Sequence, residues 1–502
     1  MAGRRCGGDG MNPHARPEST ADPEKSTRRV DAFPGISAQP ATVPRRRRRL
    51  STFGRTIDPA IPGPKGRPVI GLLPEFRRDP FESVRGWARE YGDVFHVPLP
   101  VWNLVMVNHP DLVTEVMNNR EGRYSMIGPG EKPIAMTVGS ALPMMEGERF
   151  RKRRRMLTPM FGRKHLARIA DTIVDEFTRR IERWDRYADT GEIVDLQHEI
   201  AQVTLPAFLR AMYSTRPDDK RIDQADHDIR LLMRTVAFAV FLSGPPNPLP
   251  IGANSLPLTL FRLTRLVDGL VAERVLHPSD DTDLLGLLLD IRYDDGTGLS
   301  RRDLRVELIA LMGGGYETVV SSLSHTLAQL CINPEPAQRL YDEIDGLGGA
   351  APTLDDLSRL TWAKACFDEG QRLQGHPMNP RLAMRDSELG GFQIPAGTLV
   401  GTPVYTLHRD ERWWKDPDVY DPTRFTDPSH PARPNNAFIP FGAGPHHCIG
   451  SGMAYMNAQF LLALIFQRYR LETPAGWKPK HASTFSITLD GGLPVRISRR
   501  TA

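Results

Sequence analysis

The stretch Phe441 to Gly450, FGAGPHHCIG, contains three glycines, one proline, two histidines and one of only four cysteines in this 502-residue chain. The residues that follow have apolar side chains at helical spacing from Met453 onward, which predicts a helix that begins just after Cys448. Backbone N–H groups and the positive dipole end at a helix start stabilise a thiolate, and the glycines let the main chain approach a large flat group. This pattern is typical of an axial metal ligand, although a buried cysteine after a glycine turn has the same local sequence.

The adjacent histidines, His446 and His447, suggest a zinc site at first. Adjacent histidines rarely share one metal ion, however, and no acidic or cysteine partner stands at helical spacing from them. The cysteines form no close-spaced zinc pattern, and their sparse use favours a reduced, cytoplasmic compartment. They are Cys6, Cys331, Cys366 and Cys448.

The composition, with 40% hydrophobic residues in 502, is that of a globular protein, and we expect an enzyme. The formal net charge of +5 comes from residues 1–60, whose twelve Lys/Arg and six Asp/Glu amount to +6 and leave the rest of the chain at −1. The body of the protein is therefore nearly neutral, and we expect no nucleic-acid partner. No apolar run approaches the roughly 20 residues that a bilayer crossing needs, so we expect a soluble protein.

Residues 1–60 are rich in Arg, Pro, Ser and Gly and show little periodicity, which predicts a disordered tail. The arginine run at 45–49 could contact phosphates or lipid headgroups, but a solvated segment is the simpler interpretation. Proline and glycine at Ile61–Gly71 mark the entry into the fold, and helical spacing dominates beyond it. Short β-branched pieces predict a minor β component in a mainly α protein. These pieces are residues 93–99, 103–109, 389–404 and 483–499.

A long apolar helix is predicted over Glu307–Leu330, with the three consecutive glycines of GGGYET in its middle. Each glycine costs about 1 kcal/mol relative to alanine in a helix, so something should compensate for them. Close approach of a ligand would do so, and the acid–alcohol pair Glu317 and Thr318 could relay protons into the pocket. A glycine cluster that serves helix packing, with Thr318 bonded back to a carbonyl, explains the same residues.

A further pattern places Glu369 and Arg372 three residues apart, on one face of a helix. Exposed pairs of this kind are common and contribute only about 0.2–0.5 kcal/mol. Arg424 lies in a proline-punctuated loop and is a candidate third member.

Together these pieces resemble one family, the cytochrome P450 haem-thiolate monooxygenases, from about Ile61 to the C-terminus. FGAGPHHCIG looks like the family's haem-binding loop and GGYET like its oxygen-activating motif. The Glu369, Arg372 and Arg424 set looks like its structural glutamate–arginine–arginine cluster. The resemblance implies the cytochrome P450 fold, with residues 61–502 as a single large catalytic domain and haem b as the cofactor. It assigns cofactor contacts to Cys448, His446, Arg154, Arg381, Phe441, Gly442 and Gly314, with Cys448 as the iron ligand.

The family also places an arginine four residues after a Trp or His to hold the haem propionates. In GERFRKRRRMLTPMF this arginine is Arg154, but Phe150 stands where the first donor is expected, so one propionate hydrogen bond is lost. His446 is expected as a propionate contact in a position where many members have Arg. Arg381 matches a further propionate-binding arginine, with Arg385 as its rival because the preceding segment is about one residue short.

The resemblance implies a mechanism in which the Cys448 thiolate pushes electron density toward bound dioxygen. Thr318, helped by Glu317, would organise water and deliver protons, so that an apolar C–H bond is hydroxylated. Two electrons must come from outside, since no flavin motif is present. NAD(P)H would supply them indirectly, through a ferredoxin or flavodoxin and its reductase. Basic residues such as Lys164 and Arg154 are candidates for docking that partner.

We expect a monomer that binds O2 and a small lipophilic molecule such as a fatty acid, steroid or terpene. The apolar, proline-rich segment 237–261 lies where the family covers its substrate entrance. It would suit a lipophilic substrate or transient contact with a membrane surface, and equally a loop packed on its own fold. By family analogy, the pocket includes Met126, Ile127, Met136 and Phe485.

Two other functions have to be weighed. A haem-thiolate isomerase or dehydratase rearranges peroxides without dioxygen and tends to lack the acid–alcohol pair, so Glu317 and Thr318 argue against it. A non-catalytic haem-binding or ligand-sensing protein would bind ligands without turnover.

Overall fold

The computed structural model of the chain describes residues 57–99, 103–126, 141–215, 218–241, 256–277, 283–293, 296–375, 378–483 and 487–500. All of them lie in one compact unit, residues 37–502. The arginine run at 45–49, the pocket candidates Ile127, Met136 and Phe485, and most of segment 237–261 fall outside the described residues. Description begins at Ile57, which is buried, four residues before the expected start of the catalytic domain.

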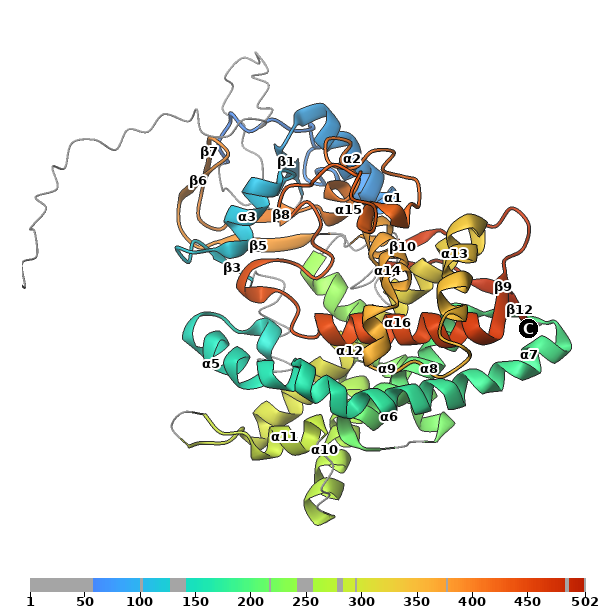
Figure 1. Cartoon of the computed structure of the whole chain (residues 1–502). Coiled ribbons are helices and arrows are strands. Elements are labelled where there is room, and N and C mark those ends of the chain that lie inside the picture. Colours follow the sequence, from blue (N-terminus) through green and yellow to red (C-terminus); the bar gives the residue numbers. More distant parts are fainter. Residues whose placement is uncertain are drawn as a thin grey trace, which may run out of the picture. The chain divides into compact units, whose positions relative to one another are not determined.

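A five-stranded sheet lies beside the first three helices (Figure 1). Its order is β1-β2-β8-β5-β3, and only β2 and β8 run parallel. Every residue of β1 is buried, including His96, so this strand is covered on both faces. The strands are β1 (Val94–Pro98), β2 (Asn103–Val107), β3 (Tyr124–Ser125), β5 (Asn379–Ala383) and β8 (Leu399–Thr402). The helices are α1 (Leu73–Arg78), α2 (Pro80–Tyr91) and α3 (Pro110–Asn118).

The remaining strands form small sheets. One has the order β4-β12-β9, and the pairs β10-β11 and β6-β7 stand separately. The predicted strand at 483–499 is thus confirmed as two strands in different sheets, since β11 pairs with β10 while β12 pairs with β4 and β9. The bounds are β4 (Ile193–Asp195), β6 (Ser387–Leu389), β7 (Phe392–Ile394), β9 (Tyr469–Glu472), β10 (His481–Ser483), β11 (Ile487–Leu489) and β12 (Pro494–Arg499).

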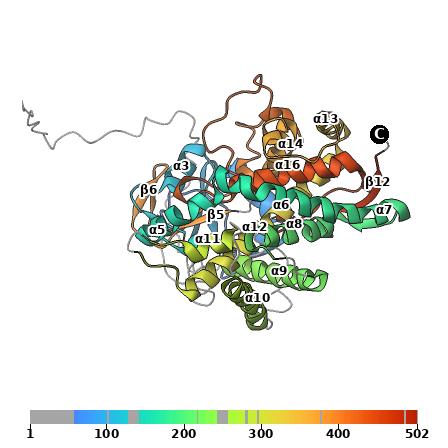
Figure 2. The same cartoon turned by 60° about the horizontal axis from the view of Figure 1, so that its bottom comes forward.

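Helices are the main component of the unit, and the mainly α prediction is confirmed. Long helices run alongside one another, with α12 among α8, α14 and α16 (Figure 2). The α-helices are α5 (Gly147–Leu157), α6 (Arg163–Ile181), α7 (Asp185–Thr190), α8 (Leu196–Tyr213), α9 (Asp219–Phe241), α10 (Leu256–Leu276), α11 (Leu284–Asp290), α12 (Arg301–Ile332), α13 (Pro334–Asp345), α14 (Thr361–Gln374), α15 (Val404–Leu407) and α16 (Ser451–Arg468). The 3₁₀ turns are η1 (Leu142–Met144), η2 (Thr158–Phe161), η3 (Glu182–Trp184), η5 (Asp355–Ser358), η6 (Pro422–Phe425) and η7 (Gly444–His446).

The main core is built on α6, α8, α12, α14 and α16. Helix α16 is apolar around its whole circumference because other elements cover it on every side, and residues Phe460 to Phe466 are all buried. Each fully buried leucine in such a core contributes about 1.5–3 kcal/mol. Gly370 lets α14 approach α12, since a Cβ there would lie 2.2 Å from Oγ1 of Thr326.

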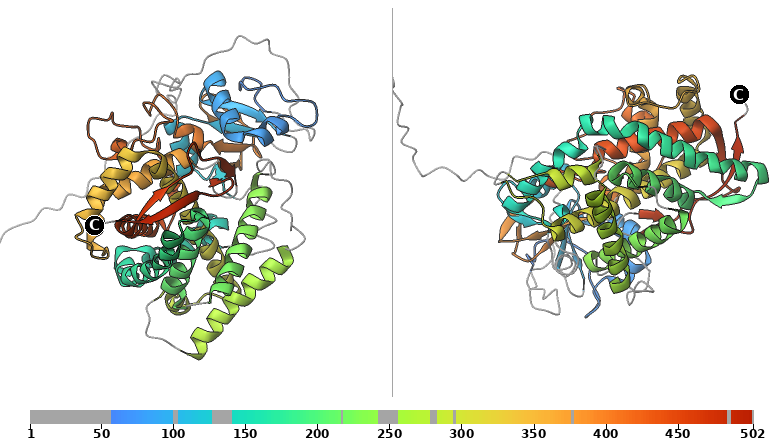
Figure 3. Two further views of the ribbon diagram at one scale, coloured as in Figure 1. Left: turned by 90° about the vertical axis from the view of Figure 1, so that its right-hand side faces the viewer. Right: turned by 90° about the horizontal axis from the view of Figure 1, so that it is seen from below.

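Helices α9 and α10 pack against each other, and α9 also packs on α12 (Figure 3). Helix α10 also packs on α12, so α9 and α10 both contact the central helix. In the described ranges, none of the helices combines the length and the apolar composition that crossing a bilayer requires.

Candidate active site

The cysteine loop between η6 and α16 is fixed by its own backbone. The Cys448 N–H donates to the Phe441 carbonyl at 2.9 Å, and α16 begins three residues after the cysteine. Gly444 has a φ of +69°, and a Cβ there would lie 2.2 Å from the carbonyl oxygen of Met117 at the end of α3. Gly442 has a φ of +70° but open space around it, so its requirement is conformational only. The predicted helix start after Cys448 is confirmed, and Gly444 seats the loop directly on α3.

The Cys448 thiol has two neighbours that favour its ionised form. Burial of the sulfur among the loop atoms raises the thiol pKa above its ordinary value, although part of the residue is exposed. The Gly450 N–H and the positive charge of Arg154 act in the opposite direction and lower that pKa. A coordinated metal cation would complete the change, because a coordinating thiol is deprotonated outright.

Helix α5 turns adjacent arginines in different directions. Arg153 is buried, and its guanidinium pairs with the Glu307 carboxylate of α12 and donates to the Tyr293 hydroxyl at 2.8 Å. Arg154 is half-buried and lies near enough to Cys448 for the two charges to interact. Burial lowers the pKa of the Arg154 guanidinium, and the Cys448 charge opposes that shift. Of the two arginines, Arg154 is the one on the cysteine side.

Phe150 occupies the position where a hydrogen-bond donor was expected, and it stacks on His446. The ring centroids are 3.9 Å apart and the planes are inclined by 27°. On the polar side of His446, its Nε2 lies 3.6 Å from a carboxylate oxygen of Glu146. Although burial opposes ionisation of Glu146, the nearby His446 side chain and the hydrogen bond from the Met126 N–H hold its pKa below the ordinary value. Glu146 went unnoticed in the sequence, because only the fold brings it to His446.

The two rival arginines of the β5 region have different surroundings. Arg381 is buried in β5, where one guanidinium N–H donates to the Pro380 carbonyl at 2.8 Å. Arg385 is exposed, and its guanidinium donates to the backbone carbonyl of Glu121 at 2.8 Å. The two arginines therefore differ in burial, since Arg385 is bound to a surface loop and Arg381 lies inside the fold.

The three glycines of α12 serve two purposes. A Cβ on Gly313 would lie 2.7 Å from the Met233 methyl group of α9, and one on Gly315 would lie 2.6 Å from the Phe208 ring of α8. A Cβ on Gly314 would meet no atom within 4 Å, and this residue is exposed in the middle of a largely buried helix. Gly313 and Gly315 are thus packing glycines, while Gly314 leaves room for a flat group against the backbone.

The acid–alcohol pair lies directly after this segment. Thr318 is half-buried, and its Oγ1 donates to the Gly314 carbonyl at 2.7 Å. Glu317 is buried. Thr318 therefore bonds to a carbonyl of its own helix, and the space beside Gly314 is open as well. The sequence had suggested these two features as alternative explanations of the glycine segment.

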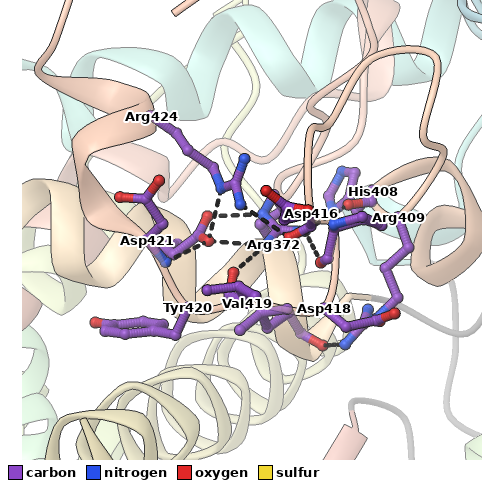
Figure 4. Close-up of polar contacts among 12 residues, drawn as sticks. Arg372, His408, Arg409, Asp416, Asp418, Val419, Tyr420, Asp421 and Arg424 are labelled. Carbon is purple, nitrogen blue, oxygen red and sulfur yellow. Dashed lines mark hydrogen bonds and ion pairs between the residues drawn. The ribbon is translucent and has the colours of Figure 1, made fainter.

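The expected third member of the acid–arginine cluster is confirmed, since Arg424 donates to Glu369 at 3.2 Å (Figure 4). Both Nε and Nη2 of Arg372 donate to the Glu369 carboxylate at 2.7 Å, and both side chains are fully buried. The remaining Arg372 donors bind the backbone carbonyls of His408, Pro417 and Val419. The cluster therefore fixes the chain at several points between His408 and Arg424, ahead of the cysteine loop.

His408 connects this cluster to the cysteine loop. Its carbonyl accepts from Arg372, and its Nε2 accepts from the Ile439 N–H at 2.9 Å. Burial, together with the charges of Arg372 and Arg409, lowers the imidazole pKa well below its ordinary value, so the ring is neutral and able to accept. The Ile439 carbonyl in turn accepts from the Gly442 N–H at 3.0 Å. A continuous set of hydrogen bonds thus joins Arg372 to the loop that carries Cys448.

The donor set suits haem and does not suit a metal held by protein side chains alone. Within the described ranges, no three His, Cys, Asp or Glu side chains are arranged to hold a metal ion. One cysteine at a helix start, a half-buried arginine beside it and a helix opened at Gly314 fit an iron porphyrin with acidic side groups.

Comparisons with known proteins agree with this chemistry. Residues 61–491 match the family described as Cytochrome P450. The chain is 28% identical over 421 residues to the cyclooctat-9-en-7-ol 5-monooxygenase of Streptomyces melanosporofaciens, covering 82% of this chain and 90% of that protein. It is 27% identical over 431 residues to the cyclooctatin synthase of the same organism, covering 85% and 93%. The crystal structure of the cytochrome P450DA heme domain superposes with a TM-score of 0.79 at 25% identity, covering 88% of this chain and 98% of that chain.

Proposed function

Because this chain belongs to the cytochrome P450 family and is a haem-thiolate monooxygenase, we propose that Cys448 is the residue that would bind the haem iron. The observation that supports this most is the arrangement around the cysteine, with a glycine-shaped loop at a helix start and Arg154 beside the sulfur. Arg154, Arg381 and His446 would hold the two carboxylates of haem b, and Phe441 and Gly442 would shape the loop against its face. Haem, when bound, supplies dioxygen activation and oxidation of the substrate C–H bond.

In this proposal the chain's own residues position groups and exclude water. Gly314 leaves space against the backbone of α12, and the Thr318 hydroxyl holds a proton at Oγ1 that it now shares with the Gly314 carbonyl. Glu317 is the acid that replenishes that proton from its buried position next in the chain. The surrounding buried side chains of α12 keep bulk water away from the reaction.

We propose a largely hydrocarbon substrate of the fatty acid, steroid or terpene kind. The relative that acts on cyclooctat-9-en-7-ol supports a substrate of this class, because its name specifies an alcohol on a hydrocarbon skeleton. Met126 is half-buried and next to the Glu146 side chain that accepts its N–H, so it remains a candidate pocket residue.

We also propose a monomeric protein in a reducing, cytoplasmic compartment. The free thiols of Cys331, Cys366 and Cys448 suit that compartment.

Electrons come from a redox partner, and we propose an acidic ferredoxin or flavodoxin with its NAD(P)H-dependent reductase. Helix α5 and the start of α6 expose a basic face, on which Glu148 is the exposed acid and pairs with Arg151 at 2.9 Å. The start of α16 packs on this side of the molecule, since Gly452 lies against Leu166 of α6. Because Arg154 is turned toward Cys448, we expect the exposed basic residues around it to dock the redox partner. They are Arg149, Arg151, Lys152, Arg155, Arg163, Lys164 and Arg168.

The docking proposal is tested by reversing charge at Lys152 and Lys164 and measuring KM for a ferredoxin at several salt concentrations. KM should rise, and its salt dependence should weaken, because exposed charges act over about 10 Å at 0.1 M salt. A matched reversal at Lys478, which is exposed beyond α16 in the sequence, is the control.

The assignment of Cys448 is tested with Cys448→Ala in the full chain. The variant should lose the thiolate-type spectrum of the reduced carbonyl complex and all turnover, and Cys366→Ala is the control because Cys366 is buried in the core. Retention of the thiolate-type spectrum in Cys448→Ala would refute the assignment.

The substrate class is tested by a screen of lipophilic ligands for the spin-state shift. Product analysis of the ligands that bind then separates a monooxygenase from a protein that only senses ligands.

A further inference from the structure

Tyr316 lies inside the GGGYET stretch of α12 and makes a polar contact that the chemistry above does not use. Its hydroxyl donates to the Asp226 carboxylate of α9, and both side chains are buried. Nε of Arg230 donates to the same Asp226 oxygen at 2.7 Å. Burial and the neighbouring Asp226 charge raise the Tyr316 pKa well above its ordinary value, so the phenol remains a donor at neutral pH.

A second contact between α9 and α12 lies on the same seam. Met233 follows Asp226 by seven residues, two helical turns, and its methyl group fills the space beside Gly313. Gly313 and Tyr316 are themselves three residues apart and share a face of α12. Helix α9 thus holds the glycine segment at two neighbouring points, one apolar and one charged.

The exposed face of the glycine segment is directed away from α9. Gly314 and Thr318 are four residues apart and share a face, which lies roughly 150° around the helix from the seam with α9, at about 100° per residue. On a third face of α12, the Phe208 ring of α8 packs against Gly315. Three consecutive glycines have no side chains of their own to anchor the backbone, so its position depends on what α8 and α9 supply.

We propose that Tyr316 and Asp226 are positioning residues, whose hydrogen bond fixes the glycine segment of α12 and thereby the Thr318–Gly314 contact on its other face. The inference rests on the proposed function of Glu317 and Thr318. It makes proton delivery sensitive to the position of α9, because displacement of α9 breaks the hydrogen bond and frees the segment.

Helix α9 provides a matched control two residues away. Asp228 is as deeply buried as Tyr316, but its carboxylate binds Arg262 of α10 at 2.6 and 2.8 Å and not α12. The Thr259 hydroxyl of α10 lies 3.4 Å from the same carboxylate. Asp226→Asn and Asp228→Asn therefore remove equal charges from one helix, and only the first touches the glycine segment.

The experiment compares the haem-loaded wild type with Tyr316→Phe, Asp226→Asn and Asp228→Asn. Hydrogen–deuterium exchange is followed in a peptide that covers residues 310–320, without substrate or electrons. Tyr316→Phe and Asp226→Asn should each speed exchange there about tenfold, the factor for one hydrogen bond of ordinary net strength, and the double variant should add little more. Asp228→Asn should change exchange in α9 and α10 but not in this peptide.

A turnover measurement completes the test, with a substrate from the ligand screen and peroxide formed per NAD(P)H consumed as the readout. Tyr316→Phe should raise the peroxide share several-fold, while Asp228→Asn should leave it at the wild-type value. Unchanged exchange in Tyr316→Phe, or an equal change in all three variants, would overturn the proposal. Faster exchange without extra peroxide would also overturn it, and Thr318→Ala then shows whether the acid–alcohol role itself has failed.

Discussion

The cysteine loop and the glycine segment of α12 are both rich in glycine, yet they are held in opposite ways. The loop is held mainly through its backbone. Gly444 lies against Met117, the Gly442 N–H donates to the Ile439 carbonyl, and the Cys448 N–H donates to the Phe441 carbonyl. The α12 segment is held by side chains of other helices and is open at Gly314. The difference suits the two proposed tasks, since an iron ligand has to stay fixed while a proton-delivering helix has to admit small molecules. Glycine content alone therefore does not determine how such a segment is held.

The largest effect is expected from Arg372→Ala, which removes the support of the cysteine loop. The variant leaves the Glu369 carboxylate buried with only Arg424 and the Asp421 N–H as partners, and it strands several carbonyls. Breaking a buried pair in this way costs about 3–5 kcal/mol. Thermal unfolding and haem retention measure the loss. The control is Arg359→Ala, in which an exposed arginine loses its contact with the half-buried Asp356, and it should change little. Normal haem retention in Arg372→Ala would mean that the loop does not depend on the cluster.

Thr318→Ala is the corresponding test for the glycine segment of α12. It should leave haem spectra and stability close to wild type, because Thr318 bonds only within its own helix at Gly314. Product formation should fall by about 100-fold, the lower end of general acid–base contributions, with peroxide made instead. Thr318→Ser, which keeps the hydroxyl, should restore most of the product. Hydroxylation that stays tightly coupled in Thr318→Ala would remove Thr318 from the mechanism.

A pair of glycine substitutions contrasts the two segments directly. Gly444→Ala should destabilise the protein by about 1–3 kcal/mol, because a positive φ and the Met117 carbonyl both oppose a Cβ. Gly314→Ala should not lower stability, since its Cβ meets no atom within 4 Å and alanine favours the helix. Thermal unfolding of the haem-loaded variants measures the loss of stability in Gly444→Ala. In Gly314→Ala the added methyl group fills the open space beside the backbone, and weaker ligand-induced spin shifts should reveal this. Equal melting temperatures for both variants would contradict the contrast.

The smallest effect is a pH dependence at the Glu146–His446 contact. The folded-state pKa of Glu146 is lowered, so its ionised form contributes stability above the ordinary glutamate pKa of about 4.3 and loses it as the pH falls through the folded value. Glu146→Gln should therefore be less stable than wild type by under about 1 kcal/mol at pH 7, and the gap should close below pH ~4. Denaturant unfolding between these pH values measures the gap. A gap that widens on acidification would show that ionised Glu146 does not stabilise the folded protein.

Sequence patterns predicted the features that depend on neighbouring residues. The helix start after Cys448, the mainly α fold, the terminal strands and the Glu369–Arg372 spacing all follow from local periodicity and turn chemistry, and the structure confirms them. The third cluster member, Arg424, was found only because a family resemblance and a proline-rich loop pointed to it.

Tertiary structure decided the rest, because these features join residues far apart in the chain. Periodicity could not say which of the three glycines is open, since that depends on Phe208 and Met233 from two other helices. It could not place Phe150 on His446 or separate Arg381 from Arg385. The Tyr316–Asp226 contact spans 90 residues. A local sequence determines what a segment can adopt, and the packing of distant helices selects which of its atoms remain free for chemistry.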